Sequence, residues 1–233
     1  MKERTTIRFT QVLTIGLAIA ISMTISASEP DVSDELPPIA PTQDELDLLK
    51  QGELLIEAVQ SDSGRGAARL RALMHTPARI VWDVIQSCDY AAVYVDGLKH
   101  CEVLERRPEY SKTHQIVDKG WSSPRLDYIF EATHQPVRSM AFKLVEGNLK
   151  EMQGYWYLEE TADGLLVTHQ LSIRPKFPAP RWLVKRFLTR STADLLACIR
   201  GLADGSGSSE LNRADIKRCP GDPSDLIQVK MLP

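Results

Sequence analysis

Six consecutive segments between residues 101 and 174 have the alternating pattern of β-strands, and only short polar or glycine-containing turns separate them. The segments are 101–107, 112–121, 125–134, 137–145, 149–160 and 164–174. Consecutive strands with such short connections lie beside one another and run in opposite directions. The pattern therefore predicts an antiparallel meander, which constrains the fold more than any other feature of the chain.

The last two of these strands form one hairpin, "GNLKEMQGYWYLEETADGLLVTHQLSIRP", from Gly147 to Pro175. The two-residue period places one apolar set on a single face: Met152, Trp156, Leu158, Val167, Leu171 and Ile173. His169 alternates with Val167 and Leu171, so it points to the same side. A buried imidazole there is either a general base, a hydrogen-bond partner for a ligand oxygen, or a satisfied core residue.

Two further strands and two helices flank the meander. The segments "GELLIEAVQ" and "AARLRALMH" predict strands on either side of the turn "SDSGRG". The segment "TPARIVWDVIQSC" predicts a helix with Thr76 as its cap and Pro77 at its first position. Its apolar face consists of Ile80, Val81, Val84, Ile85 and Cys88.

After the meander, the segment "PAPRWLVKRFLTRSTADLLACIRGLADG" predicts a long helix that ends near Gly205. Its apolar stripe consists of Val184, Leu188, Leu195, Ile199 and Leu202.

The N-terminus has the pattern of a secretory signal peptide. Lys2, Arg4 and Arg8 precede the apolar stretch "VLTIGLAIAISMTI" and the small residues "SAS", which predicts cleavage after Ala27 and export, most simply to a periplasm. An uncleaved membrane anchor is the alternative, because residues 9–27 are nearly long enough to span a bilayer. The predicted organisation is a signal peptide (1–27), an acidic Pro-rich linker (28–45), one domain (46–204) and a Ser/Gly/Pro-rich tail (205–233).

The four cysteines fit an exported chain, because disulfides persist in oxidising compartments. Cys88 ends a predicted helix and Cys101 begins the next predicted strand, so a short loop can join them. A second bond between Cys198 and Cys219 would fold the tail back onto the domain. The cysteines lack C-x₂-C spacing and the five histidines are scattered, so the sequence predicts neither a metal site nor a cofactor.

Charge and motifs exclude several classes of function. The net charge is −3, and it becomes −5 without residues 1–27, which argues against a nucleic-acid partner. The chain has no nucleophile elbow, zinc-protease motif, P-loop or dinucleotide fingerprint. Asp127 and Glu131 alternate with apolar residues and fall on the opposite, solvent-facing side. His169 is therefore the single candidate for an acid–base role.

The order of these elements resembles the START-like (SRPBCC) superfamily, in its polyketide cyclase/dehydrase and coenzyme-Q-binding branch. The resemblance covers about residues 46–204 and depends on three segments: "LMHTPARIVWDVIQSCDYAAVYVDGLKHCEVLER", "LVEGNLKEMQGYWYLEETADGLLVTHQLSIRP" and "PAPRWLVKRFL". It implies an α+β helix-grip fold, in which a curved antiparallel sheet wraps a long C-terminal helix around a hydrophobic cavity. The four cysteines and the exported N-terminus are not general features of that family.

The resemblance also implies which side chains face a cavity. On the sheet we expect Leu126, Tyr128, Phe130, Met140, Phe142, Leu144, Met152, Trp156, Leu158, Val167, His169 and Leu171. On the final helix we expect Val184, Leu188 and Leu195. The alternative is that these residues form an ordinary core around little or no void.

Three functions remain open. The leading one is an exported, non-enzymatic carrier of a lipid, quinone or sterol-like molecule; the others are a cyclase/dehydrase-type enzyme and an envelope interaction protein without a ligand. A cluster of basic and aromatic residues near the final helix predicts docking to an anionic membrane: Lys176, Phe177, Arg181, Trp182, Lys185 and Arg186. Acidic side chains elsewhere on the domain are the alternative partners for these charges.

Overall fold

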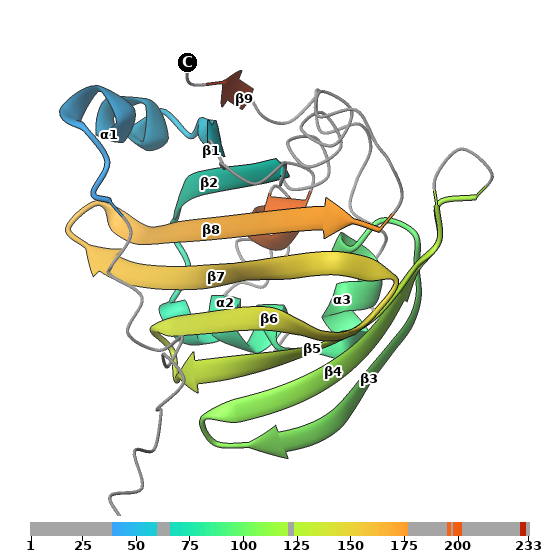
Figure 1. Cartoon of the computed structure of the whole chain (residues 1–233). Coiled ribbons are helices and arrows are strands. Elements are labelled where there is room, and N and C mark those ends of the chain that lie inside the picture. The colour runs from blue at the N-terminus through green and yellow to red at the C-terminus, as the bar shows by residue number, and fades with distance from the viewer. Residues whose placement is uncertain are drawn as a thin grey trace, which may run out of the picture. The chain divides into compact units, whose positions relative to one another are not determined.

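The computed structural model of the chain describes residues 39–59, 66–120, 124–176, 195–196, 198–201 and 229–231. Its main feature is a curved nine-stranded sheet with the strand order β3-β4-β5-β6-β7-β8-β2-β1-β9 (Figure 1). The meander strands are β3 (Leu98–Arg107), β4 (Tyr110–Val117), β5 (Leu126–Gln135), β6 (Ser139–Gly147), β7 (Leu149–Thr161) and β8 (Gly164–Pro175). Each pairs antiparallel with the next, which confirms the predicted meander.

Three strands extend the sheet beyond β8. β2 (Gly66–Met74) pairs antiparallel with β8, and β1 (Leu54–Val59) pairs antiparallel with β2. β9 (Val229–Met231) pairs parallel with β1. The segment 205–233, predicted as a Ser/Gly/Pro-rich tail, therefore contributes a strand to the sheet.

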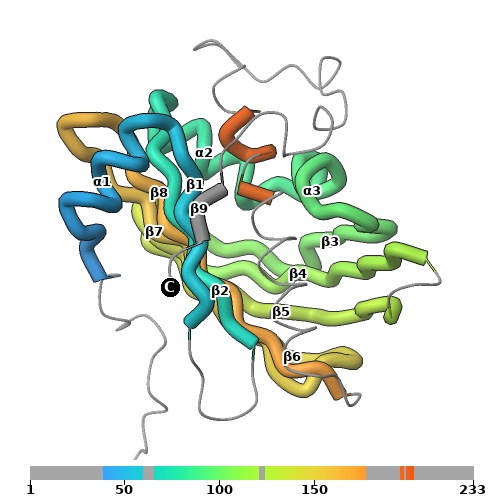
Figure 2. Tube along the Cα trace, turned by 90° about the horizontal axis from the view of Figure 1, so that it is seen from above, coloured from blue at the N-terminus to red at the C-terminus, as the bar shows by residue number. Residues whose placement is uncertain are grey.

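Helical segments lie on both faces of the sheet. α2 (Ala78–Ile85), α3 (Cys88–Tyr94) and the helical residues 195–196 and 198–201 lie on the inner face (Figures 1 and 2). α1 (Gln43–Lys50) lies on the outer face, beside β1 and β2 (Figure 2). This arrangement is the predicted α+β helix-grip fold. The N-terminal part of the predicted final helix, with Val184 and Leu188, lies outside the described residues.

The predicted helix over 76–88 is two helices. Pro77, rather than Thr76, is the N-cap residue of α2, and no side chain caps that end. α2 stops at Ile85 because Ser87 adopts an extended conformation (φ −96°, ψ 125°), after which α3 begins at Cys88. The inner face of α2 includes Trp82, which is 5% exposed and which the predicted apolar face omitted.

α1 crosses the predicted boundary between linker and domain at residues 45 and 46. A capping box starts the helix: the Glu45 backbone N–H donates to Thr42 Oγ1, and the Thr42 N–H donates to the Glu45 carboxylate. Arg71 of β2, which is buried, donates to the Glu45 carboxylate at 3.2 Å and to the Ile39 carbonyl at 2.8 Å. The end of the predicted linker is therefore fixed to the sheet.

The core fills one half of the inner face. There, α2 and two residues of the C-terminal helical segment, Leu196 and Ile199, pack on β1, β2, β7 and β8. A smaller cluster on the outer face joins Leu49 of α1 to Leu55, Leu73 and Leu166. Within the described residues, no helix is long and apolar enough to cross a bilayer. The predicted signal peptide lies outside those residues.

Candidate ligand-binding cavity

The other half of the inner face lines a cavity of about 220 Å³. Strands β3 to β8 form its sheet side, and α3, the end of α2 and Leu195 complete the lining. Alternation along each strand selects the lining, since every second side chain points inward. The inward set on β5, for example, includes Tyr128, Phe130 and His134.

Cross-strand register brings the inward residues of different strands into rows. Met140 of β6 pairs with Trp156 of β7, which in turn pairs with His169 of β8. In the next row, Phe142 pairs with Gly154. A Cβ atom at Gly154 would lie 2.6 Å from Cζ of Phe142, so this glycine leaves the space that the ring occupies.

Most of the predicted cavity residues line this space. They are Leu126, Tyr128, Phe130, Met140, Phe142, Met152, Trp156, His169, Leu171 and Leu195. Leu158 and Val167 lie instead in the core, and Leu144 packs against that core without lining the cavity. Val184 and Leu188 are outside the described residues. Whether the lining residues bind a ligand remains a prediction.

His169 is a buried residue of the cavity lining. Its ring stacks on Trp156 with 3.9 Å between ring centroids and an interplanar angle of 20°. The Nδ1 atom lies 3.0 Å from the Tyr155 carbonyl oxygen, which can only accept, so Nδ1 carries the hydrogen and donates. Burial lowers the pKa of His169 to about 4, although the hydrogen bond to Tyr155 acts in the opposite direction. The imidazole is therefore neutral at pH 7.

The lining also contains polar residues that the sequence analysis missed. Ser111, Thr113 and Gln115 of β4 all face the cavity. Ser111 Oγ lies 2.9 Å from Nε2 of His134, and burial, with a smaller contribution from Arg106, lowers the pKa of His134 to about 4. The alternation of positions 111, 113 and 115 shows that these residues share one face of the strand. Polar residues on a strand usually indicate the solvent-facing side, so the sequence did not identify this face as the inner one.

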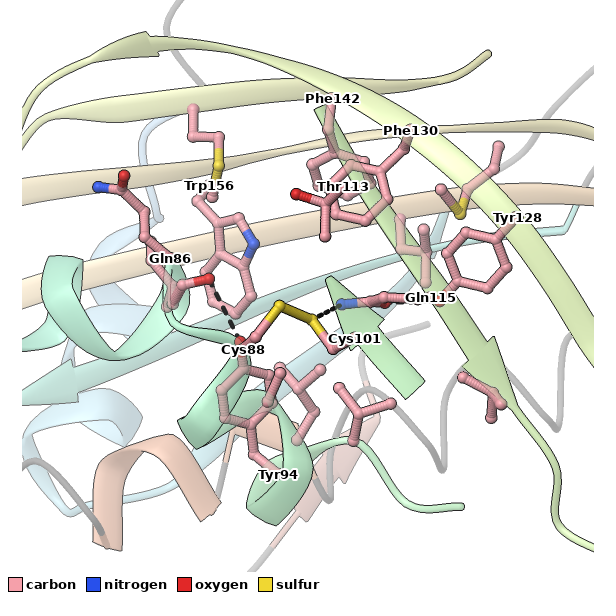
Figure 3. A pocket seen from close by; sticks show the side chains of 18 of the residues that line it. Gln86, Cys88, Tyr94, Cys101, Thr113, Gln115, Tyr128, Phe130, Phe142 and Trp156 are labelled. Atoms are coloured by element: carbon pink, nitrogen blue, oxygen red, sulfur yellow. Dashed lines mark hydrogen bonds between the residues drawn. A yellow bond between two sulfur atoms is a disulfide. The ribbon is translucent and has the colours of Figure 1, made fainter. Parts of the chain in front are cut away.

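The Cys88–Cys101 disulfide is confirmed and faces the cavity (Figure 3). It links the first residue of α3 to β3, with 5.4 Å between the two Cα atoms. Gln115 Nε2 lies 3.6 Å from the sulfur of Cys101. The second predicted bond joins Cys198 to Cys219. Cys198 is disulfide-bonded, and Cys219 lies outside the described residues.

The remaining predicted residues lie away from the cavity. Asp127 contacts His114 at 2.9 Å and Glu131 contacts Lys143 at 3.1 Å, and neither carboxylate lines the cavity. From the predicted membrane-docking set, Lys176 donates from Nζ to the Gly147 carbonyl at 2.6 Å. Phe177, Arg181, Trp182, Lys185 and Arg186 are outside the described residues. The described residues contain no group of three or more His, Cys, Asp or Glu side chains arranged to hold a metal ion.

Several solved structures have the same fold. TTHA0849 from Thermus thermophilus has 16% identity and a TM-score of 0.54, over 61% of this chain and 99% of that one. A STAR-related lipid transfer protein from Xanthomonas axonopodis has 15% identity and a TM-score of 0.51, over 62% and 96%. The di-domain aromatase/cyclase StfQ from the steffimycin pathway has 11% identity and a TM-score of 0.53, over 62% and 53%. At these identities the similarity shows the fold alone.

Sequence comparison assigns the family. No curated protein matches the chain significantly. The family model described as "Polyketide cyclase / dehydrase and lipid transport" matches residues 74–200, which is more than half of the chain and runs from the end of β2 to the C-terminal helical residues. The chain therefore belongs to the polyketide cyclase/dehydrase and lipid transport family of START-like proteins.

Proposed function

We propose that the protein is an exported, non-enzymatic binder or carrier of one hydrophobic small molecule, of the lipid, quinone or sterol-like kind. The observation that carries this proposal is the cavity on the inner face, whose walls are mainly aromatic and aliphatic. Cavities of this chemistry are the usual sites for small apolar ligands. At about 220 Å³ it is larger than an engineered apolar cavity of about 150 Å³ that binds benzene.

The acid–base groups favour binding over catalysis. A general base is most effective when its pKa lies near the working pH. The two histidines that line the cavity, His134 and His169, each have a pKa lowered to about 4. No carboxylate contacts either ring within the described residues. Such imidazoles are weak bases, whereas a carrier needs only an apolar interior.

Export is part of the proposal, and the Cys88–Cys101 disulfide supports it because such bonds are rare in reducing compartments. The mass of the mature protein from the cell envelope tests it. We expect a chain that begins at Ser28. A full-length chain in the membrane fraction would indicate the uncleaved anchor instead.

Native mass spectrometry of the protein purified from its own envelope tests ligand binding directly. We expect a bound species that organic solvent removes and that mass analysis of the extract identifies. Leu171 is half-buried and faces the cavity, so Leu171→Trp should fill the space and reduce the bound fraction. Gln153→Trp is the control, because Gln153 is exposed on the outer face of the neighbouring strand. A parent protein with no bound molecule would contradict the proposal.

A cyclase-type enzyme is the second candidate, because the neutral His169 ring lines the cavity and has an unprotonated Nε2 atom. Such an enzyme would convert a poly-β-ketone substrate, and His169→Phe would abolish the conversion. Conversion by the parent and loss in this variant would favour the enzyme over the carrier.

A further inference from the structure

Three polar side chains of β4 face the cavity, and two of them have protein partners. Ser111 pairs with His134, while Gln115 accepts a hydrogen bond from the Tyr128 hydroxyl at 2.9 Å and contacts the disulfide. Thr113 differs. It is 7% exposed, and in the part of the chain that the structure describes its hydroxyl makes no hydrogen bond. Because Thr113 lines the cavity, its hydroxyl is available to hydrogen-bond a molecule placed there.

The imidazole of His169 provides a second unpaired position. Because Nδ1 donates to the Tyr155 carbonyl, Nε2 carries a lone pair. Among the described residues, the Nδ1 contact with Tyr155 is the one hydrogen bond of this ring. Thr113 on β4 and His169 on β8 both line this space, on strands that β5, β6 and β7 separate.

A continuous series of rings connects these two positions. Tyr128, Phe130, Phe142, His169 and Trp156 contact one another in that order, with successive centroid distances of 6.3, 6.0, 6.1 and 3.9 Å. Thr113 is the cross-strand partner of Phe130, the second ring of the series (Figure 3). Ring faces and edges of this kind favour flat, ring-containing ligands.

The described lining has no cation available for an anionic ligand. Its two charged residues, Lys119 and Asp96, form an ion pair with each other at 3.0 Å. Both lining histidines are neutral at pH 7, since burial lowers the pKa of each to about 4. A carboxylate or phosphate placed among these rings would lose its hydration without gaining a counter-charge, which is costly.

We propose that the cavity selects an uncharged, ring-containing molecule with a hydroxyl or carbonyl oxygen, and that Thr113 hydrogen-bonds this oxygen. The proposal refines the proposed function, on which it rests. It favours phenol-like or polycyclic alcohols and ketones over fatty acids and anionic phospholipids. Thr113 acts as a specificity residue, and His169 Nε2 accepts from a ligand hydroxyl that reaches the His169 ring.

Three two-ring probes of similar size test the proposal by titration calorimetry with the mature protein at pH 7. The probes are 2-naphthol (uncharged, with a hydroxyl), 2-naphthoate (anionic) and 2-methylnaphthalene (without a polar group). We expect 2-naphthol to bind at least tenfold more tightly than 2-naphthoate. Thr113→Val should weaken 2-naphthol roughly three- to tenfold, the effect of one hydrogen bond, and leave 2-methylnaphthalene unchanged. Thr133→Val, on the outer face of β5, is the matched control.

The other possible outcomes contradict either the role of Thr113, the preference for an uncharged ligand, or the proposed carrier function. If 2-naphthoate binds as well as 2-naphthol, or if Thr113→Val leaves 2-naphthol binding intact, this inference is wrong and the proposed carrier function stands. If Thr113→Val weakens 2-naphthol and 2-methylnaphthalene equally, the threonine has only a packing role. If none of the three probes binds the parent, both the inference and the proposed function fail.

Discussion

At the scale of single residues, the buried histidine of β8 links stability to pH. The pKa of His169 is lowered from 6.5 to about 4, so between these values the unfolded chain binds a proton that the native chain does not. Above pH 6.5 the buried histidine therefore does not lower the free energy of unfolding. As the pH falls from 6.5 toward 4, this one group lowers the free energy of unfolding by roughly 3 kcal/mol. We expect His169→Phe to flatten this part of the profile, measured by urea unfolding at several pH values.

Two comparisons make that measurement specific. His134 is also held neutral, so part of the decrease should remain in the His169→Phe variant. Thr133 lies on the outer face of β5 and does not titrate, so Thr133→Val should keep the profile of the parent. If the parent and His169→Phe profiles have the same slope between pH 6.5 and 5, His169 is not held neutral by burial.

Gly154 is a residue at which a single methyl group should destabilise the sheet. A Cβ atom there would overlap the Gln170 carbonyl of β8 and lie 2.6 Å from the Phe142 ring. We expect Gly154→Ala to lower the free energy of unfolding by about 1–3 kcal/mol, as overpacked core sites do. Gly201→Ala is the control: nothing lies within 4 Å of its Cβ position in a helical segment, so it should be neutral or slightly stabilising. Equal effects of the two changes would refute this explanation.

At the scale of elements, the disulfide fixes α3 to the edge strand β3. Closing this loop of 13 positions should contribute about 3 kcal/mol. We therefore expect the double change Cys88→Ser and Cys101→Ser to lower the free energy of unfolding by that amount, measured with urea. Thiol labelling of the denatured, unreduced parent should modify neither Cys88 nor Cys101. Labelling at either residue would show that the bond is not formed.

The docking of α1 on the outer face predicts that this helix contributes to the stability of the domain. Leu49 is 1% exposed and packs on Leu55, Leu73 and Leu166. We expect Leu49→Ala to cost about 2–5 kcal/mol, as for other fully buried leucines. Asp44→Ala, an exposed change in the same helix, should cost a few tenths of a kcal/mol. An effect of Leu49→Ala as small as that of Asp44→Ala would place α1 outside the folded domain.

Local patterns predicted the meander because each strand alternates and each connection is a short turn. They missed α3, a seven-residue helix, since so short a helix shows little periodicity. They also missed the inward position of Thr113, because only its pairing with Phe130 identifies the face on which it lies. β9 was not predictable locally: Val229 pairs with Leu54, far away in the sequence. The position of Thr113 and the presence of β9 thus depend on strand register and on distant pairing, which local patterns do not show.

At the scale of the whole molecule, the basic segment after β8 predicts electrostatic docking to a membrane. Lys185 and Arg186 belong to a cluster of positive charges in a chain that is acidic as a whole. Each such charge near an anionic lipid surface contributes about 1 kcal/mol. We expect the mature protein to co-sediment with anionic vesicles at low salt, and the double change Lys185→Glu and Arg186→Glu to abolish this binding. Binding to neutral vesicles, or binding independent of salt, would contradict electrostatic docking.

The pairing of β2 with β8 has a consequence for the speed of folding. Leu70 pairs with His169, 99 positions later, and α2, α3 and five of the meander strands lie between them. Hairpins such as β7–β8 close short loops and form within microseconds, whereas this contact requires the closure of a long loop. Proteins rich in such distant contacts fold in milliseconds to seconds. We therefore expect β2 to join β8 more slowly than the hairpins form, and until it does the edge of β8 is open to other chains.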